Sequence, residues 1–334
     1  MHWCRIGVLC LLFVAAQSVD IVTNCNSHHI YRSYGNHHWE AVFLDCSGHW
    51  WTKESLPALP VNCTVETLLL NNNHLSGLPA SYFENQTDIG KLEFESNRFL
   101  EIPEDTLQDL NVTMDLNFKG NDVRDIKLKN ILAVKSLNLA DNKFEALKPS
   151  YFNNLPFLEV LTLDGNQIKV IENDTFQSLV LLKSLSLSGT HIYELPGHPF
   201  ANLSKLTNLD LSNNMLSGLQ KSDFVGLRNL EKLILTNNRI KSIESAVFTE
   251  LASLTSLRMD RNDLEVLESD VFVGLEAKLQ HLHLQYNWLI EIDDAISGLA
   301  NLIRLVLTYN PIVRIPNAGN MTSLIILGVT GTRI

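Results

Sequence analysis

Leucine and other apolar residues recur along most of this chain at fixed offsets from an asparagine. Read back from the asparagine, each copy runs Leu-x-x-Leu-x-Leu-x-x-Asn, and Ile or Leu follows two and five positions later. One copy consists of Leu158, Leu161, Leu163, Asn166, Ile168 and Ile171. The Leu-x-Leu alternation predicts a short strand with one buried face in every copy. Stacked copies would place these strands side by side in a parallel sheet.

The asparagine of each copy, here called the register asparagine, recurs at a near-constant spacing, which is 24 residues between Asn142 and Asn166. Threonine takes its position at Thr190 and, in an incomplete last copy, at Thr332. A period in this range predicts a solenoid of about eleven full coils and a partial twelfth. The register asparagines are Asn73, Asn97, Asn121, Asn142, Asn166, Asn214, Asn238, Asn262, Asn287 and Asn310.

Two kinds of interior residue follow from the period. The register asparagine is expected to enter the bend after each strand, where its amide would satisfy backbone groups that otherwise stay unpaired. Phenylalanine and leucine recur ten and thirteen positions later, and we expect them to fill the back of each coil as core residues. The phenylalanines are Phe83, Phe152, Phe176, Phe200, Phe224, Phe248 and Phe272.

On these motifs, residues 65–334 resemble the "typical" subfamily of extracellular leucine-rich repeat proteins. Toll-like receptor ectodomains, Slit-like guidance proteins and secreted leucine-rich immune factors carry such repeats. The resemblance implies an α/β repeat fold, a leucine-rich repeat solenoid shaped as a curved horseshoe with a parallel β-sheet on its concave face. It does not identify a ligand, because one fold serves many functions.

The beginning of the chain has the features of a secretory signal peptide. Arg5 supplies the positive charge, Ile6 to Ala16 the apolar run, and small residues near Ala16 a cleavage site. The run is shorter than the roughly 20 residues that span a bilayer. We therefore expect a secreted, extracellular protein with a signal peptide at 1–18, an N-terminal cysteine-containing cap at 19–64 and leucine-rich repeats at 65–334 without a C-terminal cap.

Sequons for N-glycosylation support this compartment. None of them falls on a variable strand position, which predicts a glycosylated back and a free concave face. Alternatively, strand positions simply disfavour the Asn-x-Thr triplet. The sequons are Asn62, Asn85, Asn111, Asn173, Asn202 and Asn320.

Removal of the signal peptide leaves three cysteines, Cys25, Cys46 and Cys63, all before the first repeat. Outside the cell we expect one disulfide among three pairings. We favour Cys25–Cys46, with Cys63 unpaired or an alternative partner, and an intermolecular bridge remains open. The segment after Cys46 resembles the N-terminal cap of such proteins but lacks the usual four-cysteine spacing, so no pairing carries over from the family.

Charge and motifs restrict the function. A formal net charge of −11 argues against nucleic acid as the main partner. The sequence contains no phosphate loop, zinc-hydrolase motif or nucleophile elbow, so we expect no enzyme and no cofactor. Histidines are frequent in the cap, but their spacing matches no ordered metal motif, and we expect surface histidines and no metal. They are His28, His29, His37, His38 and His49.

The variable positions of the Leu-x-x-Leu-x-Leu-x-x-Asn motif should face the concave side. They are small and polar in the middle repeats and become aromatic and basic towards the C-terminus. Tyr, Trp and Arg dominate the energetics of protein interfaces, so this region is the predicted ligand-binding patch. It comprises Arg258, Arg261, His281, His283, Tyr286, Trp288, Arg304 and Tyr309.

Two other interpretations of these residues stay open. The aromatics would pack against further repeats if the chain is a fragment, an idea that Ile303, Val306, Ile325 and Ile326 at nominally exposed positions support. They would otherwise be scattered surface residues.

We expect a secreted, glycosylated, non-catalytic recognition protein that binds a protein or a microbial surface component, with innate immunity as the first hypothesis. The alternatives are a cell-adhesion or guidance protein, and an assembly subunit that forms homo- or hetero-oligomers through its uncapped C-terminal edge. No membrane span is expected in the mature chain.

Overall fold

The structure is a computed structural model whose chain divides into two compact units, with the boundary between Lys143 and Phe144. The predicted signal peptide, Cys63 and the sequons Asn62, Asn85 and Asn111 lie outside the described residues. The described residues are 25–34, 37–59, 65–84, 86, 89–107, 110, 115–128, 134–314 and 319–334.

The N-terminal unit begins with an antiparallel hairpin of β1 (Asn26–Tyr34) and β2 (His37–Asp45). Parallel strands follow, and each contains a buried leucine because only one face of the strand enters the coil. The parallel strands are those that the Leu-x-Leu pattern predicts, whereas the hairpin is not. They are β3 (Val65–Leu69), β4 (Lys91–Glu93), β5 (Asp115–Asn117) and β6 (Ser136–Asn138), with one helical turn, α3 (Glu104–Leu107), between β4 and β5.

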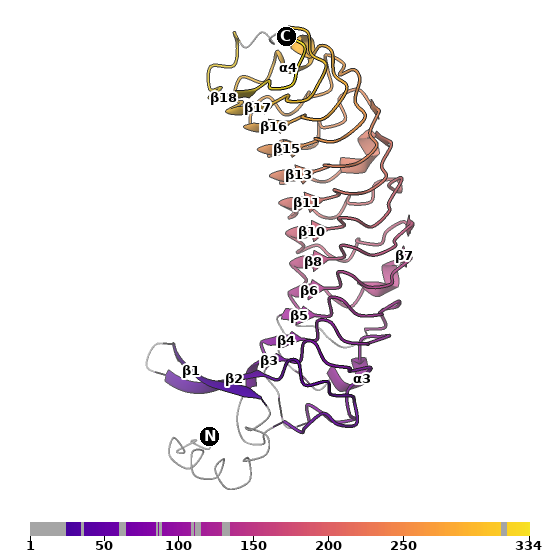
Figure 1. Ribbon diagram of the computed structural model, residues 1–334, viewed down its shortest axis with the longest axis vertical. Helices are drawn as coiled ribbons and strands as arrows, with labels where there is room; N and C mark the ends of the chain where they lie inside the picture. Colours follow the sequence, from indigo (N-terminus) through magenta and orange to yellow (C-terminus); the bar gives the residue numbers. More distant parts are fainter. Residues whose placement is uncertain are drawn as a thin grey trace. The chain divides into compact units, whose positions relative to one another are not determined.

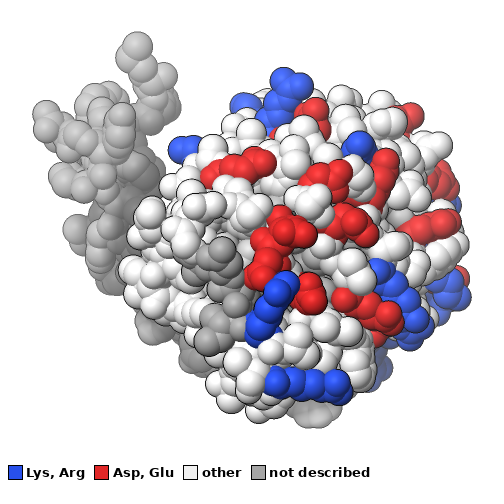
Figure 2. All heavy atoms as spheres, turned by 90° about the horizontal axis from the view of Figure 1, so that it is seen from above, with Lys and Arg blue, Asp and Glu red and all other residues white. Residues whose placement is uncertain are grey.

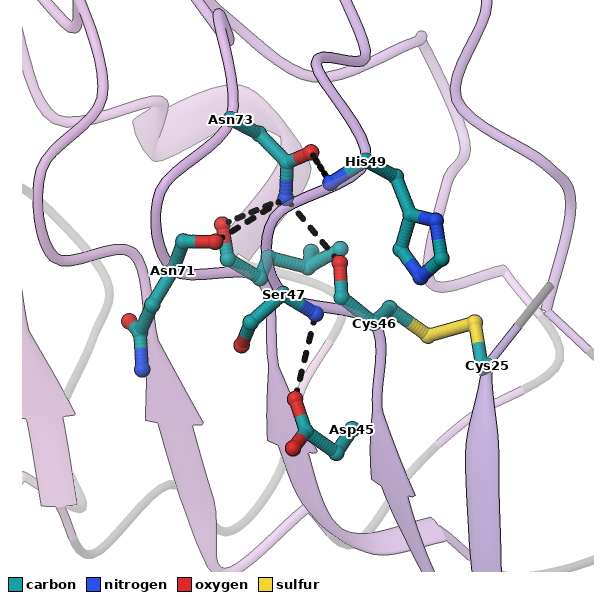
Figure 3. The surroundings of a disulfide bond; sticks show 8 residues. Cys25, Asp45, Cys46, Ser47, His49, Asn71 and Asn73 are labelled. Carbon is teal, nitrogen blue, oxygen red and sulfur yellow. Dashed lines mark hydrogen bonds between the residues drawn. A yellow bond between two sulfur atoms is a disulfide. The ribbon is translucent and has the colours of Figure 1, made fainter.

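A disulfide ties together the two ends of the hairpin, and the first register asparagine bonds the hairpin to the repeats (Figure 3). Cys46, directly after β2, is bonded to Cys25 with an S–S distance of 2.03 Å. Closing a loop of this size stabilises the folded state by about 3 kcal/mol in the chain-entropy model. The Asn73 Nδ2 donates to the Cys46 carbonyl (3.0 Å), and its Oδ1 accepts from the His49 N–H (3.0 Å). A register asparagine therefore bonds the segment after the hairpin to the first coil.

The C-terminal unit is a stack of parallel strands along one side, with short elements behind them (Figure 1). Adjacent strands pair with their central leucines in register, as Leu209 with Leu233 and Leu233 with Leu257. This arrangement confirms the predicted leucine-rich repeat solenoid. The strands are β8 (Val160–Thr162), β10 (Ser184–Ser186), β11 (Asn208–Asp210), β13 (Lys232–Ile234), β15 (Ser256–Arg258), β16 (His281–His283), β17 (Arg304–Val306) and β18 (Ile326–Gly328).

The backs of these coils contain two-residue strands and single helical turns, as expected for repeats too short to hold a full helix. The described helices are all a few residues long, and none has the length and apolar character needed to cross a membrane. The elements are β7 (Ala146–Leu147) paired with β9 (Val170–Ile171), β12 (Gly218–Leu219) paired with β14 (Ser242–Ile243), η1 (Pro149–Tyr151), η2 (Lys221–Phe224) and α4 (Asp293–Ile296).

The core behind the sheet is a column of aromatic rings. The predicted phenylalanines are all buried, and neighbours such as Phe152 and Phe176 stack with ring centroids 5.8 Å apart. Phe224 and Phe248 stack at the same distance. Offset stacking adds to the free energy gained by removing the rings from water. These residues are core, as predicted.

The register asparagines link successive coils. Asn238 Nδ2 donates to the carbonyl of Leu235 in its own coil (3.1 Å) and to that of Leu211 in the preceding coil (2.9 Å), while its Oδ1 accepts from the Leu216 N–H (3.1 Å). Asn262 repeats these bonds one coil later. Their predicted role as interior backbone partners is confirmed.

Thr190 takes the position of a register asparagine but forms fewer of its hydrogen bonds, and the backbone conformation after it differs. Its hydroxyl donates to the Leu187 carbonyl (2.8 Å) but cannot also reach back as an amide does. Instead Asn214 Oδ1 accepts from both Thr190 N–H (3.1 Å) and Ile192 N–H (3.0 Å). The residue between them, His191, then adopts a left-handed backbone with φ 65° and is exposed.

Asp223 is a buried carboxyl group at the turn η2. It forms a capping box in which its Oδ2 accepts from the Gln220 N–H (2.7 Å). Burial raises the pKa of Asp223 to about 6, and repulsion from Glu244 adds to this, against the lowering effect of the Gln220 hydrogen bond. Folding therefore makes ionisation of Asp223 less favourable than that of an exposed aspartate, and the group takes up a proton as the pH falls through about 6.

We expect Asn214→Ala to lower the free energy of unfolding by about 2–4 kcal/mol, because each buried polar group left unpaired costs about 1–3 kcal/mol. The substitution removes bonds from Nδ2 to three carbonyls, those of Leu187, Leu211 and Ser212. Urea denaturation followed by circular dichroism measures this change. Asn208→Ala, at an exposed position on β11, is the matched control and should change stability by less than about 0.5 kcal/mol. Equal stability of the two variants would contradict the role assigned to the amide.

We expect Asp223→Asn to remove a pH-dependent contribution to stability. Since the folded-state pKa lies above the unfolded value of about 4, the wild-type contribution is present below about pH 4 and is lost as pH rises to about 6. The free energy of unfolding of the wild type minus that of the variant should therefore increase from pH 7 to pH 4.5. Urea titrations of both proteins at the two pH values measure it. The same difference at both values would show that Asp223 has an ordinary pKa.

Candidate ligand-binding surface

Four of the predicted patch residues lie on three adjacent strands of the C-terminal unit. Arg258 on β15 is level with His283 on β16, and His281 on β16 is level with Arg304 on β17. Alternate positions of a strand share a face, so these side chains project from the sheet on the side opposite the buried leucines. All four are half-buried. We call Arg258, His281, His283 and Arg304 the strand cluster.

Three further patch residues lie in turns rather than on strands, one position before a register asparagine. Arg261, Tyr286 and Tyr309 adopt left-handed φ values of 57°, 58° and 56°. The turn directs each side chain to the same place one coil after another. The Arg261 guanidinium carbon lies 4.5 Å from the Tyr286 ring centroid, and the Tyr286 and Tyr309 rings stack at 4.6 Å. We call these three residues the turn ladder.

A glycine completes the ladder, and the sequence analysis did not identify it. A Cβ added to Gly331 would come within 2.7 Å of the Tyr309 ring, and its φ of 72° also disfavours a side chain. The bare backbone of the next coil thus lies against the free face of Tyr309. Tyr286 and Tyr309 are 42% and 53% exposed, so their ring edges stay available to a ligand.

Trp288 follows Asn287 and is 62% exposed. Its backbone N–H donates to the Leu264 carbonyl (2.8 Å), which fixes the backbone, while the indole is exposed. Among the described residues the indole stacks on no other ring. The structure therefore brings seven of the predicted patch residues into two ordered groups and leaves Trp288 as a separate exposed side chain.

The charge of the strand cluster is carried by its arginines. Burial, and then the positive charge of Arg258, lower the pKa of His283, so its imidazole is neutral at pH 7. Arg258 Nε lies 3.4 Å from the carboxylate of Asp260, which also accepts from the Thr236 hydroxyl (2.8 Å). Asp260 is buried, so it orients Arg258 and partly offsets its charge.

Arg304 and Arg261 have no acidic partner within the described part of the chain. The repeat pattern does not predict that Asp260 orients Arg258, because Asp260 stands at an ordinary variable position of the motif. A net positive, aromatic-rich surface results.

The positive surface contrasts with acidic side chains elsewhere on the same unit. Seen from the C-terminal end, Asp and Glu side chains gather on the molecule and Lys and Arg are fewer (Figure 2). Glu265, Glu268, Glu276, Glu291 and Asp294 are exposed carboxylates of these coils. Charge interactions decay over about 8 Å at physiological ionic strength, so a partner in contact with the patch experiences its local charge.

The apolar residues near the patch differ in exposure. Ile303 and Val306 are half-buried, whereas Ile325 and Ile326 on and beside β18 are 79% and 38% exposed. The described sequons Asn173, Asn202 and Asn320 are also exposed, and none lies on a strand.

The comparisons with known proteins agree with this architecture. A family model described as "Leucine rich repeat" matches residues 133–192, 182–240 and 228–289. Keratocan of Gallus gallus is 30% identical over 105 residues, which cover 31% of this chain and 30% of keratocan. Keratocan of Coturnix japonica gives the same values. The chain thus spans less than a third of these curated relatives.

Solved structures match over most of this chain. The TLR13–ssRNA13 complex has a TM-score of 0.74 and 28% identity, covering 81% of this chain and 40% of that chain. The Toll–Spatzle complex of Drosophila, at 0.69, 23% identity and coverages of 80% and 38%, shows the fold alone. An internalin from Listeria monocytogenes has a TM-score of 0.64 and 25% identity, covering 81% and 75%. The predicted resemblance to leucine-rich repeat proteins is confirmed.

Proposed function

We propose that this chain, which has the leucine-rich repeat fold, is a secreted, glycosylated, non-catalytic recognition protein that binds an acidic surface of another protein, in innate immunity. The binding surface would be the strand cluster and turn ladder, with Trp288 beside them. Protein binding is the common use of such repeats, and a protein or microbial surface component is the corresponding class of ligand.

The observation that supports this proposal most strongly is the turn ladder. Side chains of Arg261, Tyr286 and Tyr309 are already ordered by mutual stacking. A partner would therefore immobilise few free rotamers, and each ordered side chain saves roughly 0.5–1.5 kcal/mol on binding. Stacked aromatics and arginine next to further cations suit a partner that presents carboxylates and apolar groups together.

A protein partner is favoured over nucleic acid by charge. The chain has a net charge of −11, and a phosphate backbone requires many cationic contacts to bind. TLR13 was solved in complex with single-stranded RNA, and Toll in complex with Spatzle. Both kinds of ligand therefore belong in the test, and we expect the protein kind to bind.

Catalysis is not part of the proposal. The strand cluster contains histidines and arginines but no nucleophile held by a base, and the carboxylate of Asp260 is buried against Arg258. The group can orient a ligand and neutralise its charge. It offers no general acid–base pair at reacting distance from a nucleophile.

We expect replacement of Tyr286, Trp288 and Tyr309 together by alanine to weaken binding at least about 30-fold, because truncation of central aromatic contacts costs about 2 kcal/mol or more. Binding of the purified protein to microbial cells, to extracellular proteins of its native tissue and to single-stranded RNA is measured before and after substitution.

The matched control is a variant with alanine at Phe157, Val180 and Tyr193, which are exposed apolar residues outside the patch. It should bind like the wild type. Unchanged binding by the patch variant would refute the proposed surface, and loss of its secretion would instead favour a buried junction. If only RNA binds in a way that the patch substitutions abolish, the proposal of a protein partner is refuted.

Secretion and glycosylation are tested by intact mass. We expect protein collected from the medium of its native cells to begin at residue 17 or 19 and to lose mass on enzymatic removal of N-glycans. Substitution of Asn173, Asn202 and Asn320 by glutamine should remove part of that loss, since these sequons are exposed. Protein that retains residues 1–16, or whose mass does not change, would contradict this part of the proposal.

A further inference from the structure

A surface hollow of about 400 Å³ lies in the N-terminal unit, and no residue of the proposed patch lines it. Its walls come from the loops of three successive coils, and this size is within the usual range for small-ligand sites. The side chains that matter for its chemistry are Trp50, His74 and Arg98, together with Asn72 and Ser96.

Trp50 forms one wall because of a substitution in the repeat pattern. His49 stands where the register asparagine of the cap coil would stand, 24 residues before Asn73. Asn73 Oδ1 accepts from both His49 N–H (3.0 Å) and Trp51 N–H (3.1 Å), and Trp50 between them has a left-handed φ of 62°. The turn is the same as that at Thr190, and it sends the following side chain outward.

A left-handed backbone is unfavourable for a bulky residue, and the indole that it presents is 73% exposed. Exposing a large apolar ring costs solvation free energy as well. Backbone strain and an exposed aromatic ring at one residue are together a feature of ligand-binding positions.

Hydrogen bonds between successive coils hold the backbone around the hollow. His74 N–H donates to the Trp51 carbonyl (2.8 Å), Asn72 N–H to the Glu95 carbonyl (2.8 Å) and Arg98 N–H to the Leu75 carbonyl (2.8 Å). The His74 and Trp50 rings pack in a T-shaped arrangement, with centroids 4.9 Å apart and an interplanar angle of 84°. A ligand would meet a preformed site.

The chemistry of the walls is that of hydrogen-bond donors beside an apolar ring. Arg98 is exposed and has no ion-pair partner within the described residues, and no acidic side chain lines the hollow. An amide at Asn72 and a hydroxyl at Ser96 supply both donors and acceptors. Such walls match a ligand with a flat apolar face, several hydroxyl groups and one carboxylate.

We propose that this hollow binds an acidic sugar, a hexuronic acid residue of a glycan, whose ring lies on Trp50 and whose carboxylate meets Arg98. The hydroxyl groups of the sugar match Asn72 and Ser96, which an acidic peptide side chain would leave unused. The net charge of the chain opposes long polyanions, so the ligand is a single or terminal acidic sugar rather than a heavily charged polymer.

The test uses three small probes with the full chain: methyl β-glucuronide, methyl β-glucoside and N-acetylglutamate. The first two differ only in the carboxylate, and the third keeps a carboxylate without the sugar ring. Saturation-transfer NMR and calorimetry measure binding. We expect the glucuronide to bind in the millimolar range and at least about tenfold more tightly than either other probe, because a charge-assisted hydrogen bond and a stacked ring act together.

The variants Trp50→Ala and Arg98→Gln should each reduce glucuronide binding at least about tenfold. Phe157→Ala and Arg239→Gln are matched controls: Phe157 is an exposed aromatic residue outside both proposed surfaces, and Arg239 is exposed directly after a register asparagine, as Arg98 is. They should leave binding unchanged.

Three results would overturn the proposal: no glucuronide binding at about 10 mM, equal binding of the glucoside, or equal loss in the control variants. Tighter binding of N-acetylglutamate would assign the hollow to acidic peptides instead. Because Trp50 and Arg98 lie outside the C-terminal patch, none of these results bears on the proposed protein partner.

Discussion

The hydrogen bonds of the register asparagine amide are the interaction on which the rest of the structure depends. Burial of leucine and phenylalanine supplies most of the driving force, but it is non-directional and cannot by itself hold one coil in register with the next. A slip of one residue would turn every strand side chain to the other face. An amide such as that of Asn238 bonds carbonyls in two coils at once, Leu235 in its own and Leu211 in the preceding one. These bonds fix the register of one coil on the next, which burial of apolar side chains alone does not.

A fixed repeat has a consequence for the surface, because equivalent positions of successive coils fall into rows. Neighbouring strands lie about 4.8 Å apart, which is close to the separation that aromatic rings favour. Tyr286 and Tyr309, at the same position of two coils, stack at 4.6 Å with little distortion, and Arg261 extends the row by one coil. The geometry of the fold therefore orders a binding surface before any partner arrives.

The sequence predicted the features that depend on the period and missed those that depend on local turns. Strand positions, the buried phenylalanines and the role of the asparagines follow from spacing alone. The β1–β2 hairpin was missed, although the two residues between its strands, Gly35 and Asn36, are a pair that favours tight hairpin turns. Tyr286 and Tyr309 were expected on the concave face and lie in turns after the strands. The hollow at Trp50 was also missed, because its walls meet only when three coils are stacked.

The arginine of the turn ladder has different neighbours from the arginines that form ion pairs elsewhere on the molecule. Arg228 and Arg314 face carboxylates of the neighbouring coil, Glu250 and Glu291. Such exposed pairs stabilise little, but they leave no cation available to a partner. Arg261 lies against an aromatic ring instead, and a guanidinium on a ring keeps its outward N–H groups available for a carboxylate. In a chain with an excess of acidic residues, an arginine that is stacked on an aromatic ring and held away from carboxylates is therefore suited to receive a negatively charged ligand.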